Sequence, residues 1–496
     1  MENQYVMVID QGTTSTRVVL YDHEGMIVEI SQLACPTIRR HTGWVEHDAN
    51  QIWQDTKWLM QDVLTRAEIQ ANAIKAIGIT NQRETTVIWD KETGQPVSFA
   101  IGWQSTQSEK ITQKIKQRNI TELLHTKTGL WLDSYFSATK VLWAFDEIED
   151  LRLKAANGQV LFGTMDTWLL WQLTKGQVHG TDVSNASRTM MFNIHTLQWD
   201  DDVLEQLKIP RQILPDVYNS ADDFGCTELN GVKIPITAIA GDQQAALFGH
   251  QAFEVGAVKS TYGTGAFMMM NTGKTAQESK HGLLTTIAYG IHGEVTYALE
   301  GSIFSAGSAI QWLKDEMQLI DNAQASSDMA YRSRAAAHQQ IYLVPAFTGL
   351  GAPHWQESAR GAAFGITRMT NDADVVRATV ESLAFQTRDI LEAMQKDTGI
   401  ALSQLVIDGG VSANDYLHEF LADLLQMKVS RPINLEMTSL GIAFLAGLQS
   451  GYWPAQNELP INQAMIHIKQ HADSEHMMQK NYLGWQKAVK TVSVFP

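Results

Sequence analysis

Asp10-Gln11-Gly12-Thr13-Thr14-Ser15-Thr16-Arg17 is the stretch of sequence that decides the fold. It joins two apolar runs, residues 5–10 and 17–21, and each run predicts a buried strand. The glycine permits a tight turn whose successive N–H groups can face an anion. Hydroxyl side chains and an arginine add donors, and the aspartate at the strand end can hold a metal ion directly or through water. The stretch predicts a phosphate-binding turn, with an ordinary polar hairpin as the alternative for so short a motif.

The chain after this turn alternates strands and helices. A third strand is predicted over residues 26–30, and apolar residues on one face of residues 50–64 predict an amphipathic helix. The apolar run 74–80 predicts a further strand, and another strand follows the polar residues after it and ends at Trp89. This order is typical of an α/β domain.

The second half repeats the same order of features. A strand over residues 258–261 leads into Tyr262-Gly263-Thr264-Gly265, and residues 266–270 return as a strand. A strand over residues 405–407 ends in Asp408-Gly409-Gly410 before an amphipathic helix. Two halves that each open on strand, turn and strand predict duplicated α/β domains that face a cleft. A nucleotide in such a cleft would contact phosphate-binding turns from both walls.

Length and composition agree with two domains and limit the partners. The chain has 496 residues, too many for one compact core, so we expect domains over residues 1–250 and 251–496. The net charge of −16 argues against nucleic acid and anionic membranes as partners. Two cysteines in so long a chain indicate a cytoplasmic protein without disulfides. We expect neither a signal peptide nor a membrane span.

Three further polar groups are open to two interpretations each. Arg83-Glu84 at a strand end could bind adjacent hydroxyls of a polyol, or form a surface ion pair of little worth. Asp242 follows the strand over residues 236–240 and could accept a hydroxyl proton, or cap a helix. Gly410 and Asn414 could line an adenosine pocket, or form a βα turn with a capping asparagine.

Six segments together closely resemble the glycerol kinases of the FGGY family of carbohydrate kinases. The resemblance extends from about residue 5 to about residue 450. Asn-Gln-Arg-Glu-Thr-Thr separates the glycerol kinases from the pentulose kinases of that family. The segments are residues 10–17, Gly43-Trp44-Val45-Glu46-His47-Asp48, Asn81-Gln82-Arg83-Glu84-Thr85-Thr86, Asn185-Ala186-Ser187-Arg188-Thr189-Met190, Gly241-Asp242-Gln243-Gln244-Ala245-Ala246 and Pro345-Ala346-Phe347-Thr348-Gly349-Leu350-Gly351.

The resemblance implies a fold, an activity and a set of roles. The fold would be two duplicated actin/hexokinase-like (ribonuclease H-like) α/β domains flanking an ATP cleft. The first would bind glycerol and phosphate, the second the nucleotide, and the assembly would be a homodimer or homotetramer. ATP with Mg²⁺ would phosphorylate glycerol to sn-glycerol 3-phosphate, with Asp242 as general base and Asp10 organising the metal. Glycerol would be bound by Arg83, Glu84, Trp103, Tyr135, Asp242, Gln243 and Phe267, and ATP by Thr13, Thr14, Ser15, Arg17, Thr264, Gly307, Gln311, Gly410 and Asn414.

Three departures from the family pattern leave other functions open. Gln104-Ser105-Thr106-Gln107 stands where the family carries one or two arginines after Trp103, and His354-Trp355-Gln356 replaces a common Tyr-Trp-Asp. The short stretch 224–235 lacks a loop that serves regulation in some bacterial relatives. The alternatives are a kinase for another small polyol or ketose, a weakly active paralogue, and an actin-like ATP-binding scaffold.

Overall fold

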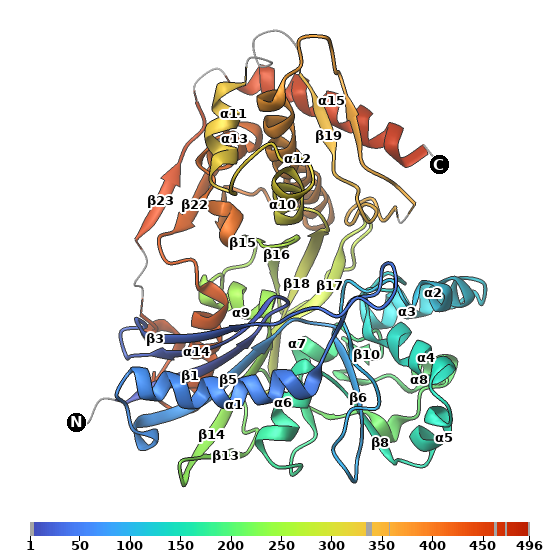
Figure 1. Cartoon of the computed structure of the whole chain (residues 1–496), viewed down its shortest axis with the longest axis vertical. Coiled ribbons are helices and arrows are strands. Elements are labelled where there is room, and N and C mark those ends of the chain that lie inside the picture. Colours follow the sequence, from blue (N-terminus) through green and yellow to red (C-terminus); the bar gives the residue numbers. More distant parts are fainter. Residues whose placement is uncertain (1–3, 334–339, 357, 461–463, 472–473, 495–496) are drawn as a thin grey trace.

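Two large β-sheets, one from each half of the chain, organise the molecule (Figure 1). The computed structural model describes residues 4–333, 340–356, 358–460, 464–471 and 474–494. The first sheet has the order β13-β14-β5-β1-β2-β3, with strands β1 (Tyr5–Gln11), β2 (Ser15–Tyr21), β3 (Ile27–Ala34), β5 (Ile74–Asn81), β13 (Cys226–Leu229) and β14 (Val232–Gly241). The second has the order β17-β18-β16-β15-β21-β22-β23, with strands β15 (Val258–Tyr262), β16 (Ala266–Gly273), β17 (Leu284–Ile291), β18 (Glu294–Ile303), β21 (Gln404–Asp408), β22 (Lys428–Pro432) and β23 (Met465–Ile468).

The two sheets share one pattern of strand directions. In the first, β3, β2 and β1 are antiparallel neighbours, and β5 and β14 continue the sheet in parallel with β1. In the second, β18, β16 and β15 are antiparallel, and β21 and β22 continue in parallel with β15. Parallel neighbours need a crossover, and α1 (Ala49–Arg66) and α13 (Asp415–Leu425) lie in two of these connections. The duplicated α/β fold predicted from the sequence is therefore confirmed.

The first sheet is buried on both faces, which explains its continuous apolar runs. In β1, Met7 and Ile9 pack on one face with α1 and α6 (Met165–Leu173). Val6 and Val8 pack on the other face with α9 (Asp242–Gly249) and α14 (Met437–Gln449). The sheet therefore holds the first turn, at the end of β1, between two fixed helical layers.

Helices α9 and α14 cross in close contact beneath the cleft. A Cβ added to Gly441 would lie 1.8 Å from the carbonyl oxygen of Ala245, so this crossing requires a glycine. Although α14 lies between β22 and β23 of the second sheet in sequence, it packs on the first sheet, as Figure 1 shows. The boundary near residue 250 stays a prediction, since α14, from the second half of the chain, packs on the first sheet.

The remaining elements cover the two sheets. One apolar core lies between the second sheet and its helices, which are α10 (Gly307–Asp315), α11 (Ala325–Arg332), α12 (Asp372–Thr398), α13 and α15 (Glu475–Val494). Another lies beside the first sheet, around the four-stranded sheet β4 (Glu46–His47), β7 (Ala100–Ile101), β6 (Thr86–Asp90) and β8 (Val160–Thr164) and the helices α2 (Glu109–Lys116), α3 (Thr121–Thr128), α4 (Ser137–Glu147), α5 (Leu151–Ala156), α7 (Val183–Ala186) and α8 (Asp201–Leu207). Two-stranded sheets pair β9 (Gly180–Asp182) with β12 (Asp216–Tyr218), β10 (Phe192–Asn193) with β11 (Gln198–Trp199), and β19 (Tyr342–Val344) with β20 (Ala362–Phe364).

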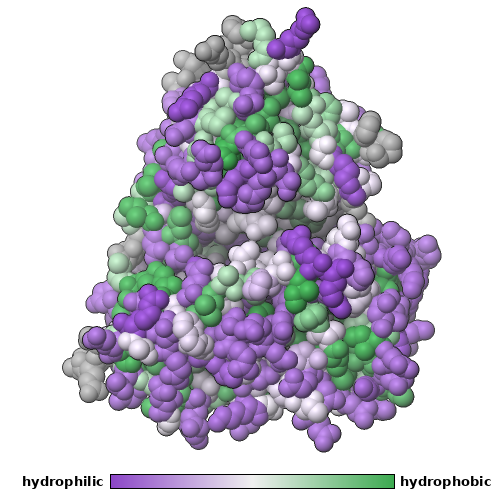
Figure 2. Space-filling model, in the orientation of Figure 1, coloured by the Kyte–Doolittle hydropathy of each residue, from purple (hydrophilic) through white to green (hydrophobic). Residues whose placement is uncertain are grey.

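The visible surface is mostly hydrophilic and is hollowed between the upper and lower parts of the molecule (Figure 2). In the part of the chain that the structure describes, no helix combines the length and apolar character needed to cross a membrane. Cys35 is buried and Cys226 is exposed, and both are free thiols.

Candidate active site

Three adjoining cavities lie where the two halves of the chain meet. The inner pocket, about 210 Å³, is lined by both turns and by residues that include Asp10, Arg83, Glu84, Asp242 and Gln243. The lateral pocket, about 610 Å³, is lined mainly by second-half residues, which include Gly307, Gln311, Gly410 and Asn414. The outer pocket, about 320 Å³, is lined by residues that include Gln104, Tyr135, Phe304 and Trp355. Thr264 lines all three, so the second turn stands where they meet.

The first turn is closed by its own backbone. The N–H of Gly12 donates to the carbonyl oxygen of Ser15 at 2.9 Å. Thr13 lines the inner pocket and accepts a 2.9 Å hydrogen bond from Trp103 Nε1, and Thr14 lines both the inner and the lateral pocket. Of the described residues in this turn, Ser15 lines none of the three cavities. The structure therefore brings Thr13 and Thr14 to the cleft and gives Ser15 a place in the turn itself.

The second turn is fixed to the start of α10. The N–H groups of Gly307 and Ser308 donate to the carbonyl oxygens of Gly263 and Thr264, at 2.9 and 3.0 Å. A Cβ on Gly307 would lie 2.4 Å from the carbonyl oxygen of Gly263, so only glycine permits this approach. The turn and the helix therefore form one rigid wall of the lateral pocket.

Arg17 connects the first turn to α14. Its guanidinium contacts the carboxylate of Asp10 and lies 2.5 Å from Glu436 Oε2. The carboxylate of Asp10 raises the pKa of Arg17, so this side chain carries a permanent positive charge. Among the described residues no group of three or more His, Cys, Asp or Glu could hold a metal ion. Mg²⁺ is often held by one or two carboxylates plus substrate phosphates, so a single carboxylate such as Asp10 fits a metal that arrives with a nucleotide.

Arg83 and Glu84 lie in a buried charge cluster that also contains Arg188 and Glu300. They are 3% and 1% exposed, so their interpretation as a surface ion pair is wrong. Glu84 lies 2.6 Å from Arg188 Nε, and Glu300 lies 2.5 Å from Arg83 Nη1 and 3.0 Å from Arg188 Nη2. Each charge therefore has a partner of opposite sign from a distant part of the chain.

The two carboxylates of this cluster are shifted in opposite directions. Burial raises the pKa of Glu84, and Arg188 only partly opposes the rise. Burial also disfavours the ionised form of Glu300, but Arg188 and Arg83 hold the pKa of Glu300 below its ordinary value. Glu300 is therefore a fixed negative charge behind Arg83, which leaves Glu84 as the carboxylate at the pocket wall.

Asp242 is the first residue of α9, and Gly241 occupies the capping position. Its interpretation as a helix cap is therefore wrong. Its Oδ1 lies 3.2 Å from Arg83 Nε, and its side chain is 30% exposed where it lines the inner pocket. Burial raises the pKa of Asp242, and the positive charges of Arg83 and Lys259 oppose the rise. A partly accessible carboxylate beside an arginine can accept a hydroxyl proton.

Aromatic rings close the inner pocket. The ring of Trp103 stands edge-on to Tyr135 and to Phe267, each at 5.7 Å between centroids. Burial raises the pKa of Tyr135 well above its ordinary value, so its hydroxyl stays protonated and can donate a hydrogen bond. The three rings provide an apolar surface for a short carbon chain.

Asn414 serves the fold as well as the lateral pocket. Its Oδ1 accepts a 2.9 Å hydrogen bond from the N–H of Leu417, so its interpretation as the cap of α13 is confirmed. Its Nδ2 donates to Ser326 Oγ at 2.9 Å. Gly410, at the start of the short 3₁₀ turn before α13, has open space where a side chain would lie, and it lines the same pocket.

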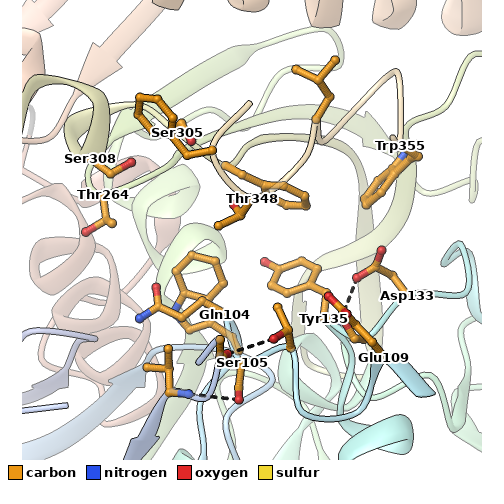
Figure 3. A pocket seen from close by; sticks show the side chains of 18 of the residues that line it. Gln104, Ser105, Glu109, Asp133, Tyr135, Thr264, Ser305, Ser308, Thr348 and Trp355 are labelled. Atoms are coloured by element: carbon orange, nitrogen blue, oxygen red, sulfur yellow. Dashed lines mark hydrogen bonds between the residues drawn. The ribbon is translucent and has the colours of Figure 1, made fainter. Parts of the chain in front are cut away.

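Gln104 and Ser105, at the start of the segment Gln104–Gln107, border the outer pocket, as Figure 3 shows. Gln104 and Thr106 line the cavity, and Ser105 Oγ donates to Gln107 Oε1 at 2.8 Å. Trp355 stands on the opposite wall. The first departure from the family pattern therefore borders this cavity, on the far side of Trp103 and Tyr135 from Asp242. Of the second, only the unchanged Trp355 lines the cavity, and His354 and Gln356 do not.

Sequence reasoning missed three buried charged residues at this site. Arg188 lies in a segment that the resemblance identified but was given no role. Glu300 and Lys259 lie in β18 and β15, and both are completely buried. A single charged residue inside an apolar strand was the available signal, since such residues are rarely buried without a partner.

Comparisons with known proteins agree with this architecture. The model of the FGGY family of carbohydrate kinases matches residues 5–249 with its N-terminal domain and residues 258–450 with its C-terminal domain. Glycerol kinases from Streptococcus agalactiae serotype Ia and Streptococcus pyogenes serotype M3 are each 50% identical over 497 residues. The alignments cover 100% of this chain and 99% and 97% of those proteins.

Solved structures extend the comparison to the fold. The Plasmodium falciparum glycerol kinase with ADP is 35% identical with a TM-score of 0.89, and the match covers 100% of this chain and 99% of that one. A ligand-bound xylulose kinase from Lactobacillus acidophilus is 21% identical with a TM-score of 0.87, and 99% of each chain is covered. The second likeness concerns the fold alone. The fold is thus the predicted pair of duplicated actin/hexokinase-like domains, and the chain belongs to the FGGY family of carbohydrate kinases.

Proposed function

We propose that the protein is an ATP-dependent kinase that phosphorylates glycerol to sn-glycerol 3-phosphate. The proposal rests on one observation: Asp242, Arg83 and Glu84 line the same small pocket as the two turns. The full-length similarity to glycerol kinases supports this substrate over other polyols. A three-carbon polyol has only three hydroxyls and a short apolar edge, which a pocket of about 210 Å³ can enclose.

The inner pocket provides a partner for each part of glycerol. Arg83 and the hydroxyl of Tyr135 would donate hydrogen bonds to hydroxyl oxygens, and Glu84 would accept one. Trp103 and Phe267 would pack against the carbon chain. Asp242 and Gln243 would bind the hydroxyl that reacts, at the side of the pocket that faces the turns.

ATP would occupy the lateral pocket, with its phosphates directed at Thr264. Gly410 and Asn414 would line the adenosine site, and Gly307 and Gln311 would stand on its phosphate side. Thr13, Thr14 and Arg17 would contact the phosphates from the first half, and Ser15 would hold the turn through its carbonyl oxygen. Mg²⁺, when bound with ATP near Asp10, would neutralise charge on the phosphate oxygens.

The reaction is an in-line phosphoryl transfer. The terminal hydroxyl oxygen of glycerol forms a bond to the γ-phosphorus while the bond from this phosphorus to the bridging oxygen breaks, and ADP leaves with that electron pair. The hydroxyl proton goes to the carboxylate of Asp242. Positive charge at Arg17 and backbone N–H groups of both turns stabilise the charge of the transferring group. Closure of the two halves would exclude water.

A kinase for a longer polyol or a ketose is the second candidate. The outer pocket favours it, because Trp103 and Tyr135 line both this cavity and the inner pocket. A substrate with more carbons could extend from one pocket into the other.

We also propose a cytoplasmic location, which is consistent with two free thiols, and a homodimeric or homotetrameric assembly.

A coupled assay of ADP release tests these proposals. Glycerol, dihydroxyacetone, erythritol, xylulose and ribulose are compared at saturating ATP and Mg²⁺. We expect the highest kcat/KM with glycerol. A higher value with erythritol or a pentulose would establish the longer substrate, and no release above background with any of them would favour the non-enzymatic scaffold.

A further inference from the structure

Lys259 is a completely buried cation that connects the two halves of the protein at the active site. It lies in β15, three residues before the second turn. Its Nζ is 2.5 Å from Gln243 Oε1, at the start of α9, and 2.9 Å from Thr261 Oγ1 in its own strand. Lys259 lines none of the three cavities, so among the described residues it stands one layer behind the pocket wall.

This contact determines which way the amide of Gln243 faces. A lysine ammonium has only donors, whereas an amide has a carbonyl acceptor and an NH₂ donor. Because Lys259 donates to the carbonyl oxygen, the Gln243 NH₂ group is the part of the amide left for a ligand in the inner pocket. With the amide turned the other way, its NH₂ group would face the ammonium and no hydrogen bond would form.

The ammonium also acts on the neighbouring carboxylates. The charged groups that face it are Asp408 from β21, Asp242 from α9, Arg83 and, from β18, Glu300. Asp408 also contacts His250 Nε2, at the other end of α9. Burial lowers the pKa of Lys259 to about 8, and the carboxylates of Asp408 and Asp242 oppose that fall. At neutral pH the group is mostly charged, and its charge favours the ionised form of Asp242.

We propose that Lys259 is a positioning residue for phosphoryl transfer, which orients the Gln243 amide as a hydrogen-bond donor to the polyol and keeps Asp242 ionised. The proposal rests on the proposed function, because it assigns Lys259 a part in polyol binding and proton acceptance. Lys259 itself touches neither substrate. Since it belongs to the second sheet and Gln243 to the first-half helix α9, the correct orientation requires both halves to be in place.

Steady-state kinetics of three variants test the contact through Gln243. We expect Lys259→Met and Gln243→Met each to raise KM for glycerol about tenfold, as expected for loss of one hydrogen bond from the amide to the polyol. The double variant should be no worse in KM than Gln243→Met, because Lys259 acts on the polyol through that amide. Lys274→Met, which removes an exposed lysine that lines none of the three pockets, is the matched control and should leave KM unchanged.

Gln243→Glu tests the orientation with Lys259 left intact. The new carboxylate can still pair with Lys259, but it offers no NH₂ donor, so KM for glycerol should rise about tenfold. An unchanged KM would mean that the polyol donates to this side chain, which contradicts the proposal. This variant decides the question even if Lys259→Met does not fold.

The pH dependence tests the effect on Asp242. In the wild type kcat/KM for glycerol should fall above about pH 8, as Lys259 loses its proton. In Lys259→Met that alkaline fall should be absent, and the acid limb of kcat should move to higher pH because Asp242 has lost a neighbouring positive charge. Additive KM effects, or pH profiles that match the wild type, would overturn the proposal. If the wild type does not phosphorylate glycerol, the proposed function itself fails.

Discussion

Two charge clusters flank the inner pocket, and they differ in how far water reaches them. The inner cluster of Arg83, Glu84, Arg188 and Glu300 has side chains that are at most 2% exposed. The outer cluster consists of Asp10, Arg17 and Glu436; the side chains of Arg17 and Glu436 are 23% and 31% exposed, and that of Asp10 is 4% exposed. Both contain arginine–carboxylate contacts of similar length, so distance alone does not distinguish them.

The difference indicates separate tasks for the two clusters. Charges without access to water are costly to separate, so the inner cluster holds a fixed geometry before any ligand arrives. Charges that remain partly hydrated exchange partners at low cost. Arg17 can therefore leave Glu436 for a phosphate group, whereas Arg83 keeps Glu300. One cluster shapes the polyol site, and the other can rearrange when the nucleotide binds.

The largest expected effect concerns Asp242, the carboxylate that the inner cluster presents to the pocket. Asp242→Asn removes the proton acceptor but leaves the contact with Arg83 almost unchanged in shape. Turnover should fall by about two to four orders of magnitude, the usual contribution of general acid–base catalysis. ATP binding, measured by calorimetry without glycerol, should stay within twofold of the wild type.

Asp202→Asn is the matched control, because Asp202 pairs with Lys127 at the surface and its side chain is 69% exposed. It should retain wild-type turnover. Near-normal turnover in Asp242→Asn would end the assignment of Asp242 as the base. Weakened ATP binding would mean that this carboxylate also organises the nucleotide site.

The second-largest expected effect distinguishes the two clusters by how much each contributes to the free energy of unfolding. Arg188→Met leaves Glu84 without its closest partner in a buried position, and should lower the free energy of unfolding by about 3–5 kcal/mol. The midpoint of urea unfolding, followed by tryptophan fluorescence, measures this loss. Arg152→Met removes an exposed pair with Asp146 and should leave the midpoint nearly unchanged. Equal midpoints for the two variants would show that burial does not strengthen the inner cluster.

The turn that carries Asp10 and Arg17 of the outer cluster could be predicted from the sequence, whereas the contacts of the inner cluster could not. The turn at residues 10–17 combines glycine, hydroxyls and charge within eight residues, so a local sequence pattern is enough to predict phosphate binding. The second turn was predictable for the same reason. Apolar runs and the turns between them predicted β1, β2, β3, β5 and β14 of the first sheet and β15, β16 and β21 of the second, whereas β13, β17, β18, β22 and β23 were not predicted.

The inner cluster could not be predicted in this way. Arg83 and Glu300 are 217 positions apart, and only the packing of β18 against the first half brings them together. Adjacent residues of opposite sign, Arg83 and Glu84, suggested a pair with each other. In the structure the backbone turns at Glu84, where φ is positive at 59°. Arg83 contacts Glu300, and Glu84 contacts Arg188, so the two adjacent residues have different partners. No sequence motif marks Lys259, because its proposed role depends on a contact with Gln243 in the other half of the chain.

The smallest expected effect concerns the outer cluster itself. Arg17→Met should weaken ATP binding about tenfold, the typical loss for one charge-assisted contact to a phosphate. The urea midpoint should fall less than for Arg188→Met, because Arg17 and Glu436 are partly hydrated and only Asp10 is left unpaired in a buried position. Glu436→Gln is the control: it keeps the charge of Arg17 and removes only a competitor for it, so ATP affinity should stay equal or rise slightly. If Arg17→Met destabilises the fold as much as Arg188→Met, the outer cluster is structural, and the first turn must bind phosphate without this arginine.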